Sequence, residues 1–175
     1  MQNLKLIEPS LEYREEIEKF RQEIMEEAYS KDKFSGCSKI EAYEKLEDWL
    51  EFLDLQGRGL VEGRVPASAF LIVEEETDDI VGILDIRFSF GREQALKSRG
   101  NIGLTIILRK RNLGYGTQAI KMALEKCRDC GLSKVMICCR EGNIGSRTTI
   151  ERNGGKLGEV EERNGELHNI YWIEL

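Results

Sequence analysis

The stretch from residue 102 to residue 117 constrains this chain more than any other part of its sequence. Residues 102–108 are almost all apolar, which predicts a central strand buried on both faces. A basic run at 109–111 and two glycines, Gly114 and Gly116, lead into a helix-like segment. Glycines leave backbone N–H groups uncovered, and the first turn of a helix has N–H groups without intrahelical partners. The pattern predicts a strand, an anion-binding turn and a helix.

Length and composition limit the class of protein. A chain of 175 residues with 41% hydrophobic residues fits a single domain over residues 1–175. The net charge of −6 argues against a sequence-independent nucleic-acid binder, which gains affinity by neutralising phosphates. No apolar run reaches the roughly 20 residues that span a bilayer, and the N-terminus lacks signal-peptide features. We therefore expect a cytoplasmic protein that binds neither nucleic acid nor membrane, and its five cysteines fit reduced thiols.

Hydrophobic periodicity predicts an α/β pattern of strand, two helices, three strands, helix, strand, helix and two strands. Ser38 and Glu41 form a candidate capping box for the second helix. Asp85 and Arg87, two residues apart, should share one face of their strand. The predicted strands are 4–6, 69–75, 80–90, 102–108, 134–140, 156–162 and 167–174, and the predicted helices are 11–29, 39–54, 116–130 and 146–153, with a loop at 57–66.

The turn matches a known signature. Arg111-x-x-Gly114-x-Gly116, between an apolar strand and a helix, resembles the Arg/Gln-x-x-Gly-x-Gly/Ala signature of the GNAT superfamily of acyl-CoA-dependent N-acetyltransferases. The resemblance extends over most of residues 65–175, where the chain is similar to bacterial acetyltransferases of unassigned substrate. It implies an α/β (α+β) fold with a mixed, mostly antiparallel sheet of about seven strands and about four helices. It also implies acetyl-CoA as co-substrate and no metal.

The resemblance assigns residues to coenzyme binding. In the family, backbone N–H groups of the turn hold the pyrophosphate of coenzyme A, and the preceding strand pairs with the pantetheine arm. Glycine suits the turn because a Cβ would obstruct the phosphate oxygens. A tight turn without a ligand is the alternative reading, and a helix N-cap explains Asn143 as well as pantetheine binding does. The implied cofactor-binding residues are Ile106, Ile107, Leu108, Arg111, Asn112, Leu113, Gly114, Tyr115, Gly116, Thr117, Asn143 and Ser146.

The catalytic groups are less well defined. Many family members have a Tyr seven residues after the pantetheine-binding Asn, where it protonates the leaving thiolate, and this chain has Ile150. Either another group donates the proton or the thiolate leaves unassisted, which a thiol pKa of about 8.5 allows. Asp85, Glu141 and His168, the single histidine, are candidates for a general base, although a lone histidine on a strand is usually structural.

The cysteines do not suggest a metal site. Cys127 and Cys130 fall at a helix end, and the adjacent Cys138 and Cys139 should point to opposite faces of a strand. Buried thiols explain them better.

Three functions follow from these observations. The first is an N-acetyltransferase that passes an acetyl group directly from acetyl-CoA to a primary amine of a small molecule or peptide. Residues 1–66 would form the acceptor side, and residues 67–175 the acetyl-CoA-binding core. The second is a non-catalytic acyl-CoA binding or sensing domain, and the third is an α/β interaction module without a ligand. The sequence does not identify the acceptor amine, and it leaves a homodimer open.

Overall fold

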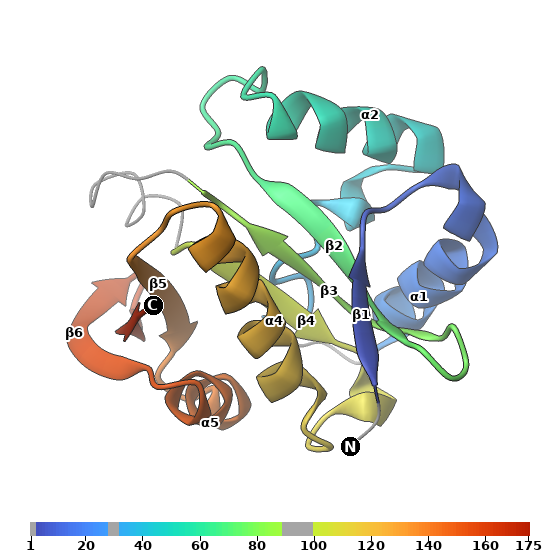
Figure 1. The fold of residues 1–175 in the computed structure, drawn as a ribbon. Helices are drawn as coiled ribbons and strands as arrows, with labels where there is room; N and C mark the ends of the chain where they lie inside the picture. Colours follow the sequence, from blue (N-terminus) through green and yellow to red (C-terminus); the bar gives the residue numbers. More distant parts are fainter. Residues whose placement is uncertain (1–2, 28–31, 89–99) are drawn as a thin grey trace.

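The computed structural model describes residues 3–27, 32–88 and 100–175, which form two antiparallel sheets and flanking helices (Figure 1). The first sheet has the order β1-β2-β3-β4, and the second has the order β5-β7-β6. The strands are β1 (Leu4–Ile7), β2 (Ser68–Glu74), β3 (Ile80–Ile86), β4 (Ile102–Ile106), β5 (Lys134–Arg140), β6 (Lys156–Arg163) and β7 (Glu166–Glu174). The helices in this part of the chain are α1 (Arg14–Glu26), α2 (Leu46–Gly57), α4 (Tyr115–Asp129) and α5 (Ile144–Arg152), with 3-10 turns η1 (Leu11–Tyr13), η2 (Ile40–Ala42) and η3 (Leu108–Lys110). The predicted fold class is confirmed.

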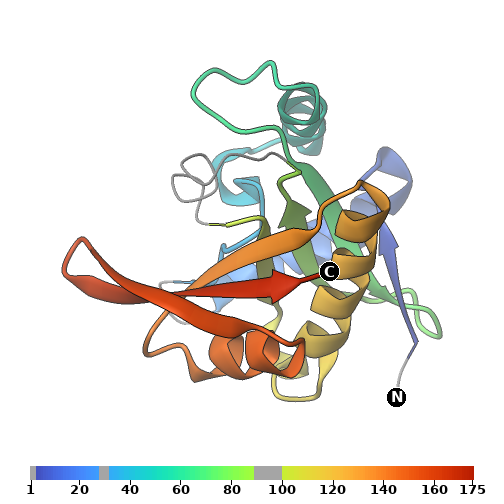
Figure 2. The same cartoon turned by 60° about the vertical axis from the view of Figure 1, so that its left-hand side comes forward.

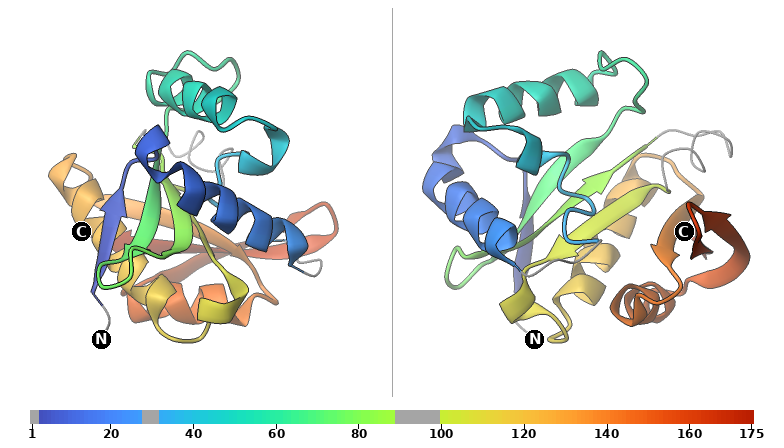
Figure 3. Two further views of the ribbon diagram at one scale, coloured as in Figure 1. Left: turned by 90° about the vertical axis from the view of Figure 1, so that its right-hand side faces the viewer. Right: turned by 180° about the vertical axis from the view of Figure 1, so that it is seen from behind.

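Helices cover both faces of the first sheet (Figure 3). On one face, Phe20 of α1 and Trp49 of α2 pack in a buried cluster with Ile83 of β3. On the other face, Ile120 of α4 packs with Leu84 of β3. Burial on both sides explains why β2 and β3 are nearly continuous apolar runs. None of the helices in the described residues is long and apolar enough to cross a membrane.

Strand β4 lies at the edge of the first sheet, so the prediction of a central strand is wrong in this respect. It pairs with β3, and just before it Gly100 forms an isolated bridge with Ile137 of β5 in the second sheet. Buried Asn101 reinforces this joint. Its N–H donates to the Met136 carbonyl at 2.7 Å, and its Oδ1 accepts from the Met136 N–H at 2.8 Å. Beyond the joint, β4 and β5 are not paired in the described residues, so the two sheets stay separate. We call this unpaired stretch between β4 and β5 the gap.

Two predicted boundaries are corrected. The helix expected at 39–54 is a 3-10 turn, η2, followed by α2, and no capping box forms because Ser38 has a positive φ of 46°. The chain here follows the surface of β4 so closely that a Cβ on Gly36 would lie 2.4 Å from the Gly103 carbonyl carbon. The strand expected at 102–108 ends at Ile106, because Leu108 begins η3.

Other predicted elements agree with the structure. Strands β2 and β3 form the expected hairpin, and helix α4 lies within one residue of its predicted bounds. Asn164 and Gly165 both have positive φ at the tight turn between β6 and β7, as a two-residue hairpin requires. This hairpin projects from the body of the protein (Figure 2). The ends of two predicted elements, residues 28–29 and 89–90, and the connection at 91–99 lie outside the described residues.

Candidate functional site

The glycine turn forms a cradle, defined here as residues 111–117, at the N-terminus of α4. Gly114 is the N-cap and has a φ of 92°, which disfavours a side chain, and Asn112 also has a positive φ of 62°. A Cβ added at Gly114 would meet no atom within 4 Å, so the turn faces open space. The first intrahelical bond runs from the Gln118 N–H to the Gly114 carbonyl at 3.1 Å. The Gly116 and Thr117 N–H groups precede it in the first turn of α4 and so lie at the positive end of the helix dipole, as anion binding requires.

The basic run beside the cradle is committed to ion pairs. Arg109 contacts Glu23 of α1 and Asp79 of the β2–β3 turn at 2.8–3.2 Å. Arg109 and Lys110 also line a pocket of about 530 Å³ between α1 and that turn, and this pocket is lined by both acidic and basic residues. The side chains of Arg109 and Lys110 therefore point to the α1 side of the turn. The cradle's attraction for an anion must come mainly from its backbone.

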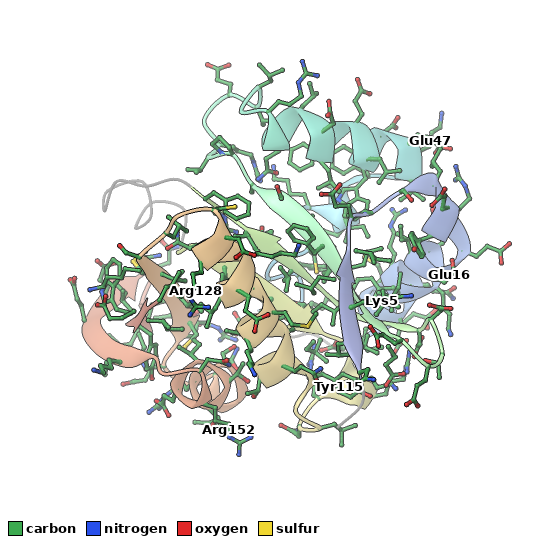
Figure 4. The ribbon with its side chains drawn as sticks, viewed as in Figure 1. Lys5, Glu16, Glu47, Tyr115, Arg128 and Arg152 are labelled. Atoms are coloured by element: carbon green, nitrogen blue, oxygen red, sulfur yellow. The ribbon has the colours of Figure 1, made fainter. Side chains whose placement is uncertain are left out.

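Beneath the cradle, a buried carboxylate orients the start of α4. Glu74 of β2 accepts hydrogen bonds from Lys110 at 2.7 Å, from Tyr115 and from Thr77. Burial raises the pKa of Glu74, but these hydrogen bonds outweigh it and the net pKa is lowered. Burial and the bond to Glu74 together raise the pKa of Tyr115, which stands at the first position of α4 (Figure 4). The ionised Glu74 thus fixes the loop and the helix start relative to β2.

Arg111, the first residue of the signature, connects the cradle to α1. Its guanidinium donates to both carboxylate oxygens of Glu27 at 2.8 and 2.9 Å, and its Nε donates to the Ile106 carbonyl at 2.8 Å. The Glu27 side chain is only 4% exposed. Arg111 therefore has a structural position between the end of β4 and the end of α1.

The open edge of β4 offers main-chain groups to the gap. The Ile107 N–H donates to the Val81 carbonyl at 3.0 Å. Because main-chain groups alternate in direction along an antiparallel strand, the N–H and C=O groups of Leu104 and Ile106 point away from β3. The Ile107 carbonyl accepts from the Lys110 N–H at 3.0 Å. Both main-chain groups of Ile107 are thus already hydrogen-bonded. Leu104, which the sequence analysis did not include, lies at the open edge instead.

Asn143 stands at the start of α5, next to the end of β5. It is the helix N-cap, because its Oδ1 accepts from the Ser146 N–H at 3.0 Å. Its Nδ2 donates to Asp32 at 2.8 Å. Ile150, at the position of the family's tyrosine, is 1% exposed and packs against Gly155. A Cβ added at Gly155 would lie 2.4 Å from Cγ2 of Ile150. That position faces the core.

The three candidate bases have different surroundings. Asp85 is 4% exposed, is paired with Arg87 at 2.8 and 2.9 Å, and accepts from the Gly103 N–H at 3.1 Å. Glu141 is exposed. His168 is partly buried opposite Arg140 in the β5–β7 ladder, with Nδ1 3.2 Å from the Glu166 carbonyl. All three therefore lie next to a residue of β4 or β5: Asp85 contacts Gly103, Glu141 follows Arg140, and His168 pairs with Arg140.

Asp32 borders the gap and was not identified from the sequence. Its carboxylate accepts from Arg140 at 2.8–3.0 Å, and its carbonyl accepts from the Thr105 hydroxyl at 3.4 Å. Burial raises its pKa, but the bonds from Arg140 and Asn143 lower it more, and the net pKa lies below the ordinary 3.8. Asp32 lies in a polar loop segment, and the local sequence does not indicate a contact with Arg140, 108 positions away.

The sequence was compared with known protein families. The family model described as the Acetyltransferase (GNAT) domain matches residues 5–156. The chain belongs to the GNAT acetyltransferase family. Acetyl-CoA is the acyl donor of GNAT enzymes. A search of curated protein sequences gave no significant match.

Solved structures of other GNAT proteins share the fold. RimL, a ribosomal L7/L12 α-N-protein acetyltransferase in complex with coenzyme A, has a TM-score of 0.70 and 17% identity over 100% of this chain and 96% of RimL. A GNAT acetyltransferase from Streptococcus pneumoniae has a TM-score of 0.68 and 15% identity, covering 99% and 100%. The microcin C7 self-immunity acetyltransferase MccE, in complex with acetyl-CoA and AMP, has a TM-score of 0.65 and 20% identity, covering 98% and 92%. At these identities the structures show a common fold.

Metal ligands do not gather in the described residues: no group of three or more His, Cys, Asp or Glu side chains is arranged to hold an ion. The cysteines are free thiols, and burial raises the pKa of Cys127 and of Cys139 to about 12. Both thiols therefore stay protonated at neutral pH.

Proposed function

We propose that this protein is an N-acetyltransferase that transfers the acetyl group of acetyl-CoA directly to a primary amine. The observation that carries the proposal is the cradle, where Gly114 faces open space at the N-terminus of a 15-residue helix. A phosphate group fits there because a backbone with positive φ and no side chain allows close approach. Family membership supplies the acyl donor, which brings the acetyl group as an activated thioester.

Each region of the site has a proposed task. The backbone of residues 111–117 holds the pyrophosphate, and the open edge of β4, including the Leu104 and Ile106 N–H groups, pairs with the pantetheine arm. Asn143 adds an amide donor from α5. A backbone N–H at this edge would also polarise the thioester oxygen, so that positioning and electrostatics carry most of the catalysis. His168 is the proposed base, since its strand partner Arg140 contacts Asp32 and an imidazole is a common general base.

The acceptor is proposed to approach from the α1 and α2 side. Asp32, Thr105 and Arg140 lie at the gap on this side, and α4 covers the opposite face of the first sheet. Two of the structural neighbours are named for an amine acceptor: RimL is an α-N-protein acetyltransferase, and a chimera is named as a spermidine N-acetyltransferase. Amines are therefore the first acceptors to test, and a cytoplasmic location is proposed with them.

The test of the cradle compares two glycines. Gly114→Glu places a carboxylate where the phosphates would lie, and we expect CoA affinity to fall by at least about 100-fold, measured by calorimetry. Gly131→Glu is the matched control and should leave CoA affinity unchanged, because Gly131 also has a positive φ and no atom within 4 Å of its added Cβ but lies just after the other end of α4. An unchanged CoA affinity in a folded Gly114→Glu variant would refute the cradle assignment.

A non-catalytic acyl-CoA binding or sensing domain is the second candidate. It is favoured by one observation, the buried Ile150 at the position of the family's acid. The two functions differ in thiol release when acetyl-CoA is mixed with a panel of amino acids, polyamines and peptide N-termini. Thiol release that depends on an amine supports the enzyme. CoA binding without release from any amine supports the sensor.

A further inference from the structure

We infer that Asp32 is a positioning residue for coenzyme binding and that it acts by fixing the side-chain amide of Asn143. This role depends on the proposed function, because the proposed ligand of Asn143 is the pantetheine arm. Asp32 belongs to the segment between α1 and η2, on the proposed acceptor side. Its place in the structure ties that side to the helix that would hold the coenzyme.

The two ends of the Asn143 amide have different partners. Its Oδ1 accepts from the Ser146 N–H at 3.0 Å, and its Nδ2 donates to Asp32 Oδ2 at 2.8 Å. The reverse orientation would place NH₂ against an N–H donor and the amide oxygen against a carboxylate. Asp32 and Ser146 therefore select one orientation. A side-chain amide has two N–H donors, so one remains for a carbonyl of the ligand.

Asp32 is itself held in place. Arg140, the last residue of β5, donates from Nε to both carboxylate oxygens at 2.9 and 3.0 Å and from Nη2 at 2.8 Å. The pair is partly shielded from solvent, with side chains 30% and 27% exposed. The lowered pKa keeps Asp32 ionised at neutral pH, and an ionised carboxylate only accepts hydrogen bonds. In its hydrogen bond with Asn143, Asp32 is therefore always the acceptor.

The segment that carries Asp32 is anchored on the other side of the gap. Gly36 packs on Gly103 of β4, and the Thr105 hydroxyl of β4 donates to the Asp32 carbonyl. Asp32 therefore touches β4 through its backbone and β5 and α5 through its side chain. Without the carboxylate, the Asn143 amide keeps its Ser146 bond but loses the partner that directs its NH₂ group. Binding of the pantetheine arm then requires the amide to be ordered by the ligand, which lowers affinity.

The experiment separates the pantetheine arm from the nucleotide. Dissociation constants of CoA and of adenosine 3′-phosphate 5′-diphosphate, which lacks the arm, are measured for wild type and Asp32→Ala. We expect Asp32→Ala to weaken CoA binding by about fivefold or more and nucleotide binding by less than about twofold. Asp54→Ala, which breaks the Asp54–Arg58 ion pair on α2, is the control and should change neither. An equal loss for both ligands would overturn the role, because it would indicate a general structural effect.

A double-mutant cycle tests whether Asp32 acts through Asn143. In an Asn143→Ala background, Asp32→Ala should weaken CoA binding by less than about twofold more, because the amide it positions is already absent. Additive losses would overturn the mechanism. Asp32→Leu, whose side chain has no hydrogen-bond acceptor, tests the same step if Asp32→Ala is poorly folded, and should also weaken CoA more than the nucleotide.

The outcomes distinguish this role from the proposed function. If wild-type protein does not bind CoA, both are contradicted. If wild-type protein binds CoA and Asp32→Ala binds it equally well, only the role of Asp32 is contradicted.

Discussion

The two ends of the gap between β4 and β5 are held together in different ways. At the joint, Asn101 is 5% exposed and joins β3 and β5 through neutral hydrogen bonds. At the other end, the Asp32 side chain is 30% exposed and forms an ion pair with Arg140 of β5, and its carbonyl accepts from Thr105 of β4. Breaking a buried neutral network leaves unpaired groups in the core, whereas a partly exposed ion pair contributes little net stability. The gap is therefore closed by a buried neutral network at one end and by a partly exposed ion pair at the other.

The largest effect is expected from Asn101→Ala. The Met136 N–H and the Arg87 carbonyl would lose their partners inside the protein. We expect the free energy of unfolding to fall by about 4 kcal/mol, measured by urea denaturation. Asn3→Ala, near the N-terminus, serves as an exposed control. A loss below about 1 kcal/mol would show that the two sheets do not need this joint.

Gly36→Ala should have the next largest effect, and it acts between the two ends, where Gly36 packs on Gly103 of β4. The added methyl would approach Gly103 to 2.4 Å, and φ at Gly36 is 76°. Overpacking and backbone strain together should cost about 3 kcal/mol. Gly63→Ala is the matched control, since Gly63 also has positive φ but no atom lies within 4 Å of its added Cβ. Equal losses in the two variants would mean that strain alone, and not contact with β4, explains the effect.

Asp32→Ala should destabilise the protein by only about 1 kcal/mol, because its ion pair is partly exposed. Comparison with Asn101→Ala in the same urea titrations tests the contrast between the two ends directly. The contrast fails if Asp32→Ala costs as much as Asn101→Ala.

The smallest expected effect is a difference in acid sensitivity. The pKa of Asp32 is lowered in the folded state, so its stabilisation is fully present above 3.8 and is lost as pH falls through the lower folded value. Stability measured between pH 2 and pH 7 should therefore decline less steeply below about pH 4 in Asp32→Asn than in wild type. Some decline should remain in the variant, because Glu74 and Asp79 also have lowered pKa values. Parallel curves would show that the partners of Asp32 do not stabilise its ionised form in the folded protein.

Local sequence patterns predicted the turn of the cradle, but not the residues that border the gap. Glycines at 114 and 116 after an apolar strand specify a turn whose geometry depends on neighbouring residues, and the structure shows that turn. Register was harder to predict, because pairing of Ile107 with Val81 decides which β4 amides face the gap. The sequence did not indicate the roles of Asp32, Glu27 and Asn101. Each acts through a hydrogen bond to a residue at least 35 positions away.

The sequence by itself determined the order of elements, the cradle at the start of α4 and membership of the GNAT acetyltransferase family. These depend on periodicity and on residue types close together in the chain. Only the tertiary structure decided that β4 is an edge strand, that the basic run is paired with carboxylates of α1 and β2, and that Ile150 faces the core. Those properties depend on which distant segments come into contact, and contact is set by the packing of the whole chain.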